Sequence, residues 1–165
     1  MTRAGAAARV SVVLVALGLA QFGLRPRLAD PRFAPDFILL ALLFLALRVR
    51  PGAGAIAGFL VGLGTDALAP TAFGAAALAA TVIGYTAGWV RTVFVAENVL
   101  VSALFVLGAA WARDIIQVVA SAQLAGGGLA WQLLVLSPAA ALATAAAGLV
   151  TLLIAGRWLG ARAHP

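Results

Sequence analysis

The sequence contains no cysteine, no lysine and one histidine, His164, the penultimate residue. Without cysteine there is no disulfide, no thiol nucleophile and no iron–sulfur or zinc–thiolate site. A single histidine in that position also argues against catalysis or metal binding through histidine. Acidic residues number only five, and they form no paired-carboxylate motif, nucleophile–base pair or phosphate loop. The sequence therefore predicts a protein without enzymatic activity, cofactor or metal, which works by binding, transport or assembly.

Charge is also scarce, whereas apolar residues are abundant. Of the 165 residues 64% are hydrophobic and 10% charged, against about 45–50% and about 25% in average soluble domains. The mean hydropathy is +1.11, so disorder is excluded, because disordered chains are poor in apolar residues. A pI of about 11.8 is typical of nucleic-acid-binding domains, but the arginines are scattered among apolar runs and form no basic stripe. What remains is an integral membrane protein.

Six apolar stretches fill the chain and leave no room for a soluble domain. In a bilayer only helices and closed barrels can span, and these runs are continuous rather than alternating with period two. The sequence therefore predicts an all-α, polytopic helical bundle, formed by one integral membrane domain over residues 1–165. The expected spans are residues 10–24, 34–47, 53–68, 73–90, 98–122 and 129–155, the last with a kink at Pro138.

Two of these stretches leave alternatives open. The 34–47 stretch is short for a span, which needs about 20 residues. It is therefore re-entrant, buried in the core or a true span, and the number of membrane spans is five or six. The N-terminal stretch resembles a signal peptide, with Gly18-Leu-Ala20 as a cleavage motif. A retained helix is favoured, because the residues from Gln21 to Leu24 extend the apolar run.

The arginines orient the chain. Positive residues concentrate in cytoplasmic segments, and with both termini in the cytoplasm seven arginines lie inside and three outside, while Arg113 lies within a span. The first outer loop, with Arg25, Arg27 and Arg32, is the exception. The inner set is Arg3, Arg9, Arg48, Arg50, Arg91, Arg157 and Arg162. We expect a multi-pass membrane protein with both termini in the cytoplasm.

The glycines are explained better by helix packing than by nucleotide binding. Two segments, 52–57 and 62–67, match the dinucleotide pattern G-x-G-x-x-G/A, but no strand precedes either, and that mechanism requires one. Small residues repeated every four positions let helix backbones approach closely in lipid. The sequence predicts packing within the bundle, rather than a dimer face, through Gly54, Gly58, Gly62, Gly84 and Gly88.

Four charged residues in the outer half of the bundle are the candidate functional cluster: Asp36, Asp66, Arg113 and Asp114. Charged groups within spans face the interior and pair with one another, so we predict an interhelical ion pair between Asp66 and Arg113. Two alternatives stay open: Asp66 is a hydrated interfacial residue, or the polar face around Arg113 lines a structural water pocket. The four tryptophans lie mostly near span ends, as in an interfacial belt.

A series of apolar and glycine-rich motifs extends over residues 20–90. In order they are Arg25-Pro26, Ala34-Pro-Asp-Phe-Ile-Leu-Leu40, Leu47-Arg48, Gly54-x-x-x-Gly58-Phe-Leu-x-Gly62-Leu-x-x-Asp66, Pro70-x-x-Phe-Gly74, Leu78 and Gly84-Tyr85. Their order and spacing resemble the rod shape-determining protein MreD family. The Gly-Leu-x-x-Asp helix end is the strongest element, and Thr65 stands where an apolar residue is more usual. The resemblance implies a protein of the bacterial inner membrane.

The resemblance implies a non-enzymatic subunit of the machinery that elongates the bacterial side wall. It implies the bitopic coiled-coil protein MreC as partner, with MreB, RodA and the elongation transpeptidase in the wider complex. The bundle of this family is similar to the substrate-binding subunits of energy-coupling-factor vitamin transporters. The alternative function is therefore small-molecule uptake.

Overall fold

The computed structural model describes residues 3–27, 34–68, 72–90, 99–120 and 131–160, and every regular element within these ranges is helical. The prediction of an all-α fold is confirmed. The α-helices are α1 (Arg3–Gly23), α2 (Phe37–Ala46), α3 (Pro51–Leu68), α4 (Ala75–Val90), α5 (Val99–Ala120) and α7 (Ser137–Gly160). A 3-10 turn, η1 (Arg25–Arg27), follows α1, and a π-helix, η3 (Gln132–Leu136), precedes α7.

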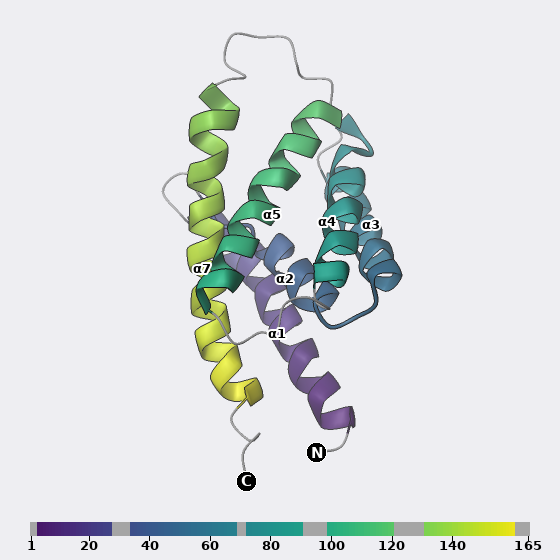
Figure 1. The fold of residues 1–165 in the computed structure, drawn as a ribbon, viewed down its shortest axis with the longest axis vertical. Helices are drawn as coiled ribbons and strands as arrows, with labels where there is room; N and C mark the ends of the chain where they lie inside the picture. Colours follow the sequence, from purple (N-terminus) through teal and green to yellow (C-terminus); the bar gives the residue numbers. More distant parts are fainter. Residues whose placement is uncertain (1–2, 28–33, 69–71, 91–98, 121–130, 161–165) are drawn as a thin grey trace.

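The helices pack as a bundle in which α3 and α4 form one close pair and α5 and α7 another (Figure 1). The beginning of α1 and the end of α7 lie at the same end of the molecule, which we call the inner end (Figure 1). The α3–α4 pair is joined to the rest through contacts of α4 with α5 and of both helices with α2. Helix α1 packs mainly against α2.

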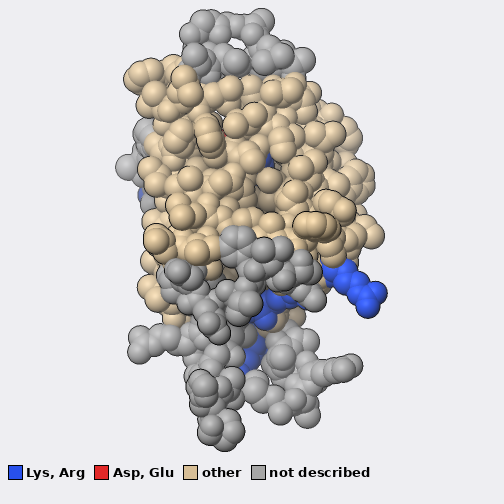
Figure 2. Space-filling view, viewed as in Figure 1, with Lys and Arg blue, Asp and Glu red and all other residues tan. Residues whose placement is uncertain are grey.

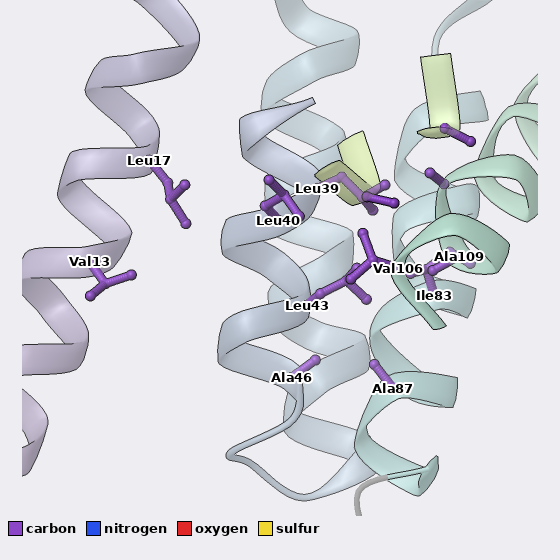
Figure 3. Close-up of a cluster of buried hydrophobic side chains, with 13 residues drawn as sticks. Val13, Leu17, Leu39, Leu40, Leu43, Ala46, Ile83, Ala87, Val106 and Ala109 are labelled. Carbon is purple, nitrogen blue, oxygen red and sulfur yellow. The ribbon is translucent and has the colours of Figure 1, made fainter. Parts of the chain in front are cut away.

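Helix α2 is the centre of the bundle. It contacts α1, α3, α4, α5 and α7, and none of its ten residues is exposed. Leu43 is fully buried, and Figure 3 shows it beside Val106 and Ile83, while Val13 and Leu17 complete the core from α1. This all-round burial explains why the sequence of α2 is apolar on every face, whereas a surface helix keeps a polar side.

Within the described part of the chain, three helical segments are long and apolar enough to cross a membrane: Pro51–Leu68, Leu100–Ala120 and Leu133–Thr151. Helix α2 has only ten residues, about 15 Å at 1.5 Å per residue, against about 30 Å for the hydrocarbon core. Of the alternatives left open for residues 34–47, the structure therefore favours a short helix buried in the core. Helix α1 begins at Arg3, seven residues before the start of its predicted span, 10–24.

Most of the described surface is apolar. Figure 2 shows arginine on the inner half of the visible face and no acidic residue among the described atoms there. Arg48 and Arg50, between α2 and α3, are exposed, and the Arg48 guanidinium lies 5.2 Å from the centroid of the Phe44 ring. Other predicted features fall outside the described residues, namely Arg32, Arg91, Arg162, the Pro70 turn and the span ends at 98, 121–122 and 129–130.

Candidate functional site: a polar junction at the start of α2

The polar junction is built around the first turn of α2. Asp36 is the N-cap of this helix, with φ −90° and ψ 93°, and its Oδ1 accepts a hydrogen bond of 2.9 Å from the N–H of Leu39. Aspartate is a favoured N-cap, because its carboxylate serves backbone donors that have no partner inside the helix. Pro35 precedes it and restricts Ala34 to an extended conformation. The local sequence Ala-Pro-Asp thus predicts where α2 begins.

Two further backbone donors of this turn are served by other helices. The N–H of Phe37 donates to Gln21 Oε1 of α1, and the N–H of Asp36 donates to Thr144 Oγ1 of α7, both at 3.1 Å. The Thr144 hydroxyl in turn donates to the carbonyl of Ala140 at 2.9 Å. Gln21 is 9% exposed and Thr144 only 2%, so side chains do here what water does at an exposed helix end.

The fourth member of the junction is Arg113 of α5, which forms an ion pair with Asp36 Oδ2. Their side chains are 15% and 14% exposed, respectively. The polar junction, defined as Gln21, Asp36, Arg113 and Thr144, therefore joins α1, α2, α5 and α7. Arg113 balances the charge of Asp36, and the positive end of the α2 dipole adds to that balance.

The ion pair of the junction lies inside the bundle. Arg48 and Arg50 follow one end of α2, and the ten residues of this helix separate them from Asp36 by about 15 Å. Ionisable residues within an apolar bundle are rare, and they pair with one another or mark a functional site. Here the pair leaves no buried polar side-chain atom of the described residues without a hydrogen-bond partner.

Asp66 makes a separate site at the start of α4. It lies near the end of α3, is 4% exposed, and accepts backbone hydrogen bonds from Gly74 (3.0 Å), Ala76 (3.1 Å) and Ala77 (2.9 Å). Gly74 has φ +98°, a conformation that favours glycine. The first helical hydrogen bond of α4 runs from the N–H of Leu78 to the carbonyl of Gly74. Because glycine has no side chain to cap α4, Asp66 supplies the carboxylate from the neighbouring helix.

The predicted ion pair between Asp66 and Arg113 is therefore corrected. Arg113 pairs with Asp36, and Asp66 is engaged by three backbone N–H donors. Both aspartates stabilise the first turn of a short helix, which the charges alone did not indicate. Asp114 is half-buried on α5 next to Arg113. Of the four predicted residues, Asp36 and Arg113 thus lie together in the polar junction, whereas Asp66 lies in a separate site.

The sequence reasoning missed Gln21 and Thr144. Each is a single polar residue in an apolar helix, and a threonine in lipid can also satisfy its hydroxyl within its own helix, as Thr81 does with the carbonyl of Ala77. The available signal was the position of Gln21. It follows Val13 and Leu17 at intervals of four, and these three are the described residues of α1 that are buried, so they share one face of the helix.

Three glycines of α3, Gly54, Gly58 and Gly62, face α4 with no room for a side chain. A Cβ on Gly58 would lie 2.6 Å from the carbonyl carbon of Ala80, and one on Gly62 would lie 2.7 Å from that of Ala76. Gly54 and Gly84 face each other in the same way. Gly88 lies against the backbone of Pro51, whose Cα a Cβ would approach to 2.7 Å. The five glycines thus bring the two helix backbones into direct contact, which is how small residues act in membranes.

Comparison with protein-family models decides the family. The model described as rod shape-determining protein MreD matches residues 8–154 of the chain. The chain belongs to the MreD family. The search of curated proteins found no match, and neither did the search of solved structures. Membership makes this chain a rod-shape membrane protein of the cell-shape machinery, a structural family that is not known for enzymatic activity.

Most of the MreD-like motifs contain the residues that make the contacts just described. The Ala-Pro-Asp motif begins α2 and ends in the Asp36 N-cap. The run from Gly54 to Asp66 is the packing face of α3, in which every fourth residue is buried. Thr65, the departure from the family pattern, donates to the carbonyl of Gly62 at 2.7 Å. The hydroxyl is thereby satisfied within the helix, and the packing face is unchanged.

Proposed function

We propose that this MreD-family protein is a non-catalytic subunit of the wall-elongation machinery, which acts through protein–protein contacts in the plasma membrane. Its direct partner is an MreC-type bitopic coiled-coil protein, and MreB, RodA and the elongation transpeptidase belong to the wider complex. In this role the bundle regulates cell shape and peptidoglycan synthesis as a scaffold rather than through chemistry of its own. The observation that carries the proposal is the family match over residues 8–154.

The use of the polar side chains supports a role through contacts. Asp36 and Asp66 cap helices, Arg113 neutralises one of them, and Gln21 and Thr144 serve backbone donors. Among the described residues, no group of three His, Cys, Asp or Glu side chains could hold a metal ion. These polar side chains thus form hydrogen bonds and an ion pair with other groups of the bundle.

The proposed orientation places the inner end in the cytoplasm. The beginning of α1 and the end of α7 lie at that end (Figure 1). Arg48 and Arg50 lie next to the inner end of α2. Because arginines concentrate on the cytoplasmic side, both termini are cytoplasmic and the two aspartate caps face the outer half of the bilayer.

The test is an affinity purification from the native host in mild detergent, followed by mass spectrometry. The bait carries a C-terminal tag, and an unrelated polytopic membrane protein with the same tag is the matched control. We expect an MreC-type coiled-coil protein to be enriched over the control. Copurification of ABC-type ATPases without that partner would overturn the proposal in favour of a vitamin-uptake subunit.

A second readout separates the two functions in cells. Depletion of a shape-determining subunit widens or rounds rod-shaped cells, whereas depletion of an uptake subunit produces a growth defect that the added vitamin relieves. We expect altered cell width that does not respond to vitamin supplements. Normal width after complete depletion would contradict the proposal even if a coiled-coil protein copurified.

A further inference from the structure

Helix α7 is preceded by a π-helix, and a proline stands at the junction. The π-helical residues are Gln132–Leu136, and α7 begins at Ser137 with Pro138 as its second residue. Proline at the first turn of an α-helix is ordinarily harmless, because its missing N–H would have no partner there. Here the helix continues upstream, so the missing N–H deprives a carbonyl of its donor. Pro138 therefore removes a backbone donor from within a continuous helical segment.

The spacing of the π-helix identifies that carbonyl. In a π-helix each carbonyl accepts a hydrogen bond from the N–H five residues later. The N–H that would serve Leu133 belongs to residue 138, which is proline and has none. A carbonyl without a donor is costly in a membrane, because no bulk water replaces the lost bond. The sequence of α7 thus creates one backbone acceptor that another element must satisfy.

The structure supplies that donor from α5. The indole Nε1–H of Trp111 donates to the carbonyl of Leu133 at 3.1 Å. This is the acceptor that the π spacing and Pro138 leave open. We propose that Trp111 is a positioning residue that replaces the N–H missing at Pro138 and so holds η3 in its π-helical form against α5.

This role distinguishes Trp111 from an interfacial tryptophan. Trp131 is 63% exposed, as a belt residue is, whereas Trp111 is 39% exposed and bonded to a backbone carbonyl of another helix. An α-helical turn contains one residue fewer than a π-helical turn, so a change from π to α geometry rotates the residues before Ser137 by about 100° about the helix axis. The bond from Trp111 therefore determines which side chains of η3 face α5 and which face lipid.

A double-mutant cycle tests the proposal. Trp111→Phe removes the indole N–H, and Pro138→Ala provides a backbone N–H at residue 138. That N–H donates to Leu133 in π geometry; in α geometry it donates to Leu134, and the N–H of Ser137 donates to Leu133. Unfolding by SDS in mixed micelles is measured for both single variants and the double variant. Trp111→Phe should raise the unfolding equilibrium constant by about two- to tenfold, the typical effect of one hydrogen bond. In the Pro138→Ala background that effect should largely disappear.

The controls keep the outcome decisive. Trp131→Phe should change the unfolding equilibrium little in either background. If Trp111→Phe destabilises equally with Pro138 or alanine at that position, then Trp111 acts through packing alone and the proposal is overturned. A second measurement uses the unaltered protein and does not depend on whether a variant folds. The sequence has four tryptophans, so four indole N–H signals can be followed by NMR. The Trp111 signal should exchange with solvent more slowly than that of Trp131, and equal rates would contradict the bond.

Discussion

Removal of the charge of Arg113 is the most informative perturbation of the polar junction. In the Arg113→Leu variant the Asp36 carboxylate keeps its bond from Leu39, but it loses its counterion inside the apolar bundle. Asp36→Asn is the complementary change, because asparagine is also a good N-cap and retains an oxygen for that bond. It leaves Arg113 without an anion. Each single change therefore isolates a charge and leaves the helix start intact.

The expected magnitude follows from the burial of the pair. Breaking a buried ion pair by removing one partner costs about 3–5 kcal/mol, and a charge at the centre of a spanning helix costs about 2.5–3.5 kcal/mol. Since the two side chains are 15% and 14% exposed, we expect about 3 kcal/mol for each single variant. The double variant, Asp36→Asn with Arg113→Leu, contains no isolated charge. It should be at least about 1.5 kcal/mol more stable than the sum of the single effects predicts.

The assay is SDS-induced unfolding in mixed micelles, followed by circular dichroism. Arg50→Gln is the matched control, because Arg50 is exposed at the inner end, and it should change the free energy of unfolding by no more than about 0.5 kcal/mol. Additive effects of the two junction substitutions would refute the reasoning, since they would show that Asp36 and Arg113 do not depend on each other.

Three further predictions concern the other contacts. Asp66→Ala leaves three backbone donors of the α4 start without an acceptor and should destabilise by about 3 kcal/mol or more in the same assay, whereas Asp66→Asn, which keeps one acceptor oxygen, should retain part of that stability. Gly58→Ala forces a Cβ against the backbone of α4 and should cost about 1–3 kcal/mol, while Gly64→Ala, which meets no atom within 4 Å, should be neutral or stabilising. The intact mass of the protein purified through a C-terminal tag should include α1, because Gln21 and its helix belong to the core; a product beginning at Gln21 would contradict this.

The helical fold could be predicted from the sequence because its signals are local. Long apolar runs, Ala-Pro-Asp before α2 and Gly-Leu-x-x-Asp at the end of α3 each determine a helix or its boundary from neighbouring residues. The glycine spacing also identified the face of α3 that meets α4. The length of α2 was ambiguous, because an apolar run in a membrane protein has the same composition whether it contacts lipid or other helices. Only its contacts with five helices distinguish the two.

The pairing within the candidate site could not be predicted from the sequence. The sequence predicts Asp36, Asp66 and Arg113 in the same half of the bundle, and electrostatics alone allows either aspartate as the partner of Arg113. The choice depends on which carboxylate is already occupied by backbone donors. Asp66 is occupied, because Gly74 cannot cap α4 and the α3–α4 packing brings Asp66 to that position. Such competition between partners is a property of the packed bundle.

The two aspartate caps have a consequence for how variants of this protein should be interpreted. Asp36 and Asp66 each stabilise the start of a short helix with buried backbone donors. Substitutions there act first on folding, so a loss of rod shape in such variants does not identify a partner surface. Exposed apolar residues of α3 and α7 are suitable for that purpose, for example Leu60 (61% exposed) and Leu142 (58% exposed), because replacing them with another apolar residue leaves the core unchanged. A shape defect in a variant of that kind, with normal unfolding, would locate a protein contact, whereas a defect confined to the caps would indicate that the folded bundle itself is what the machinery requires.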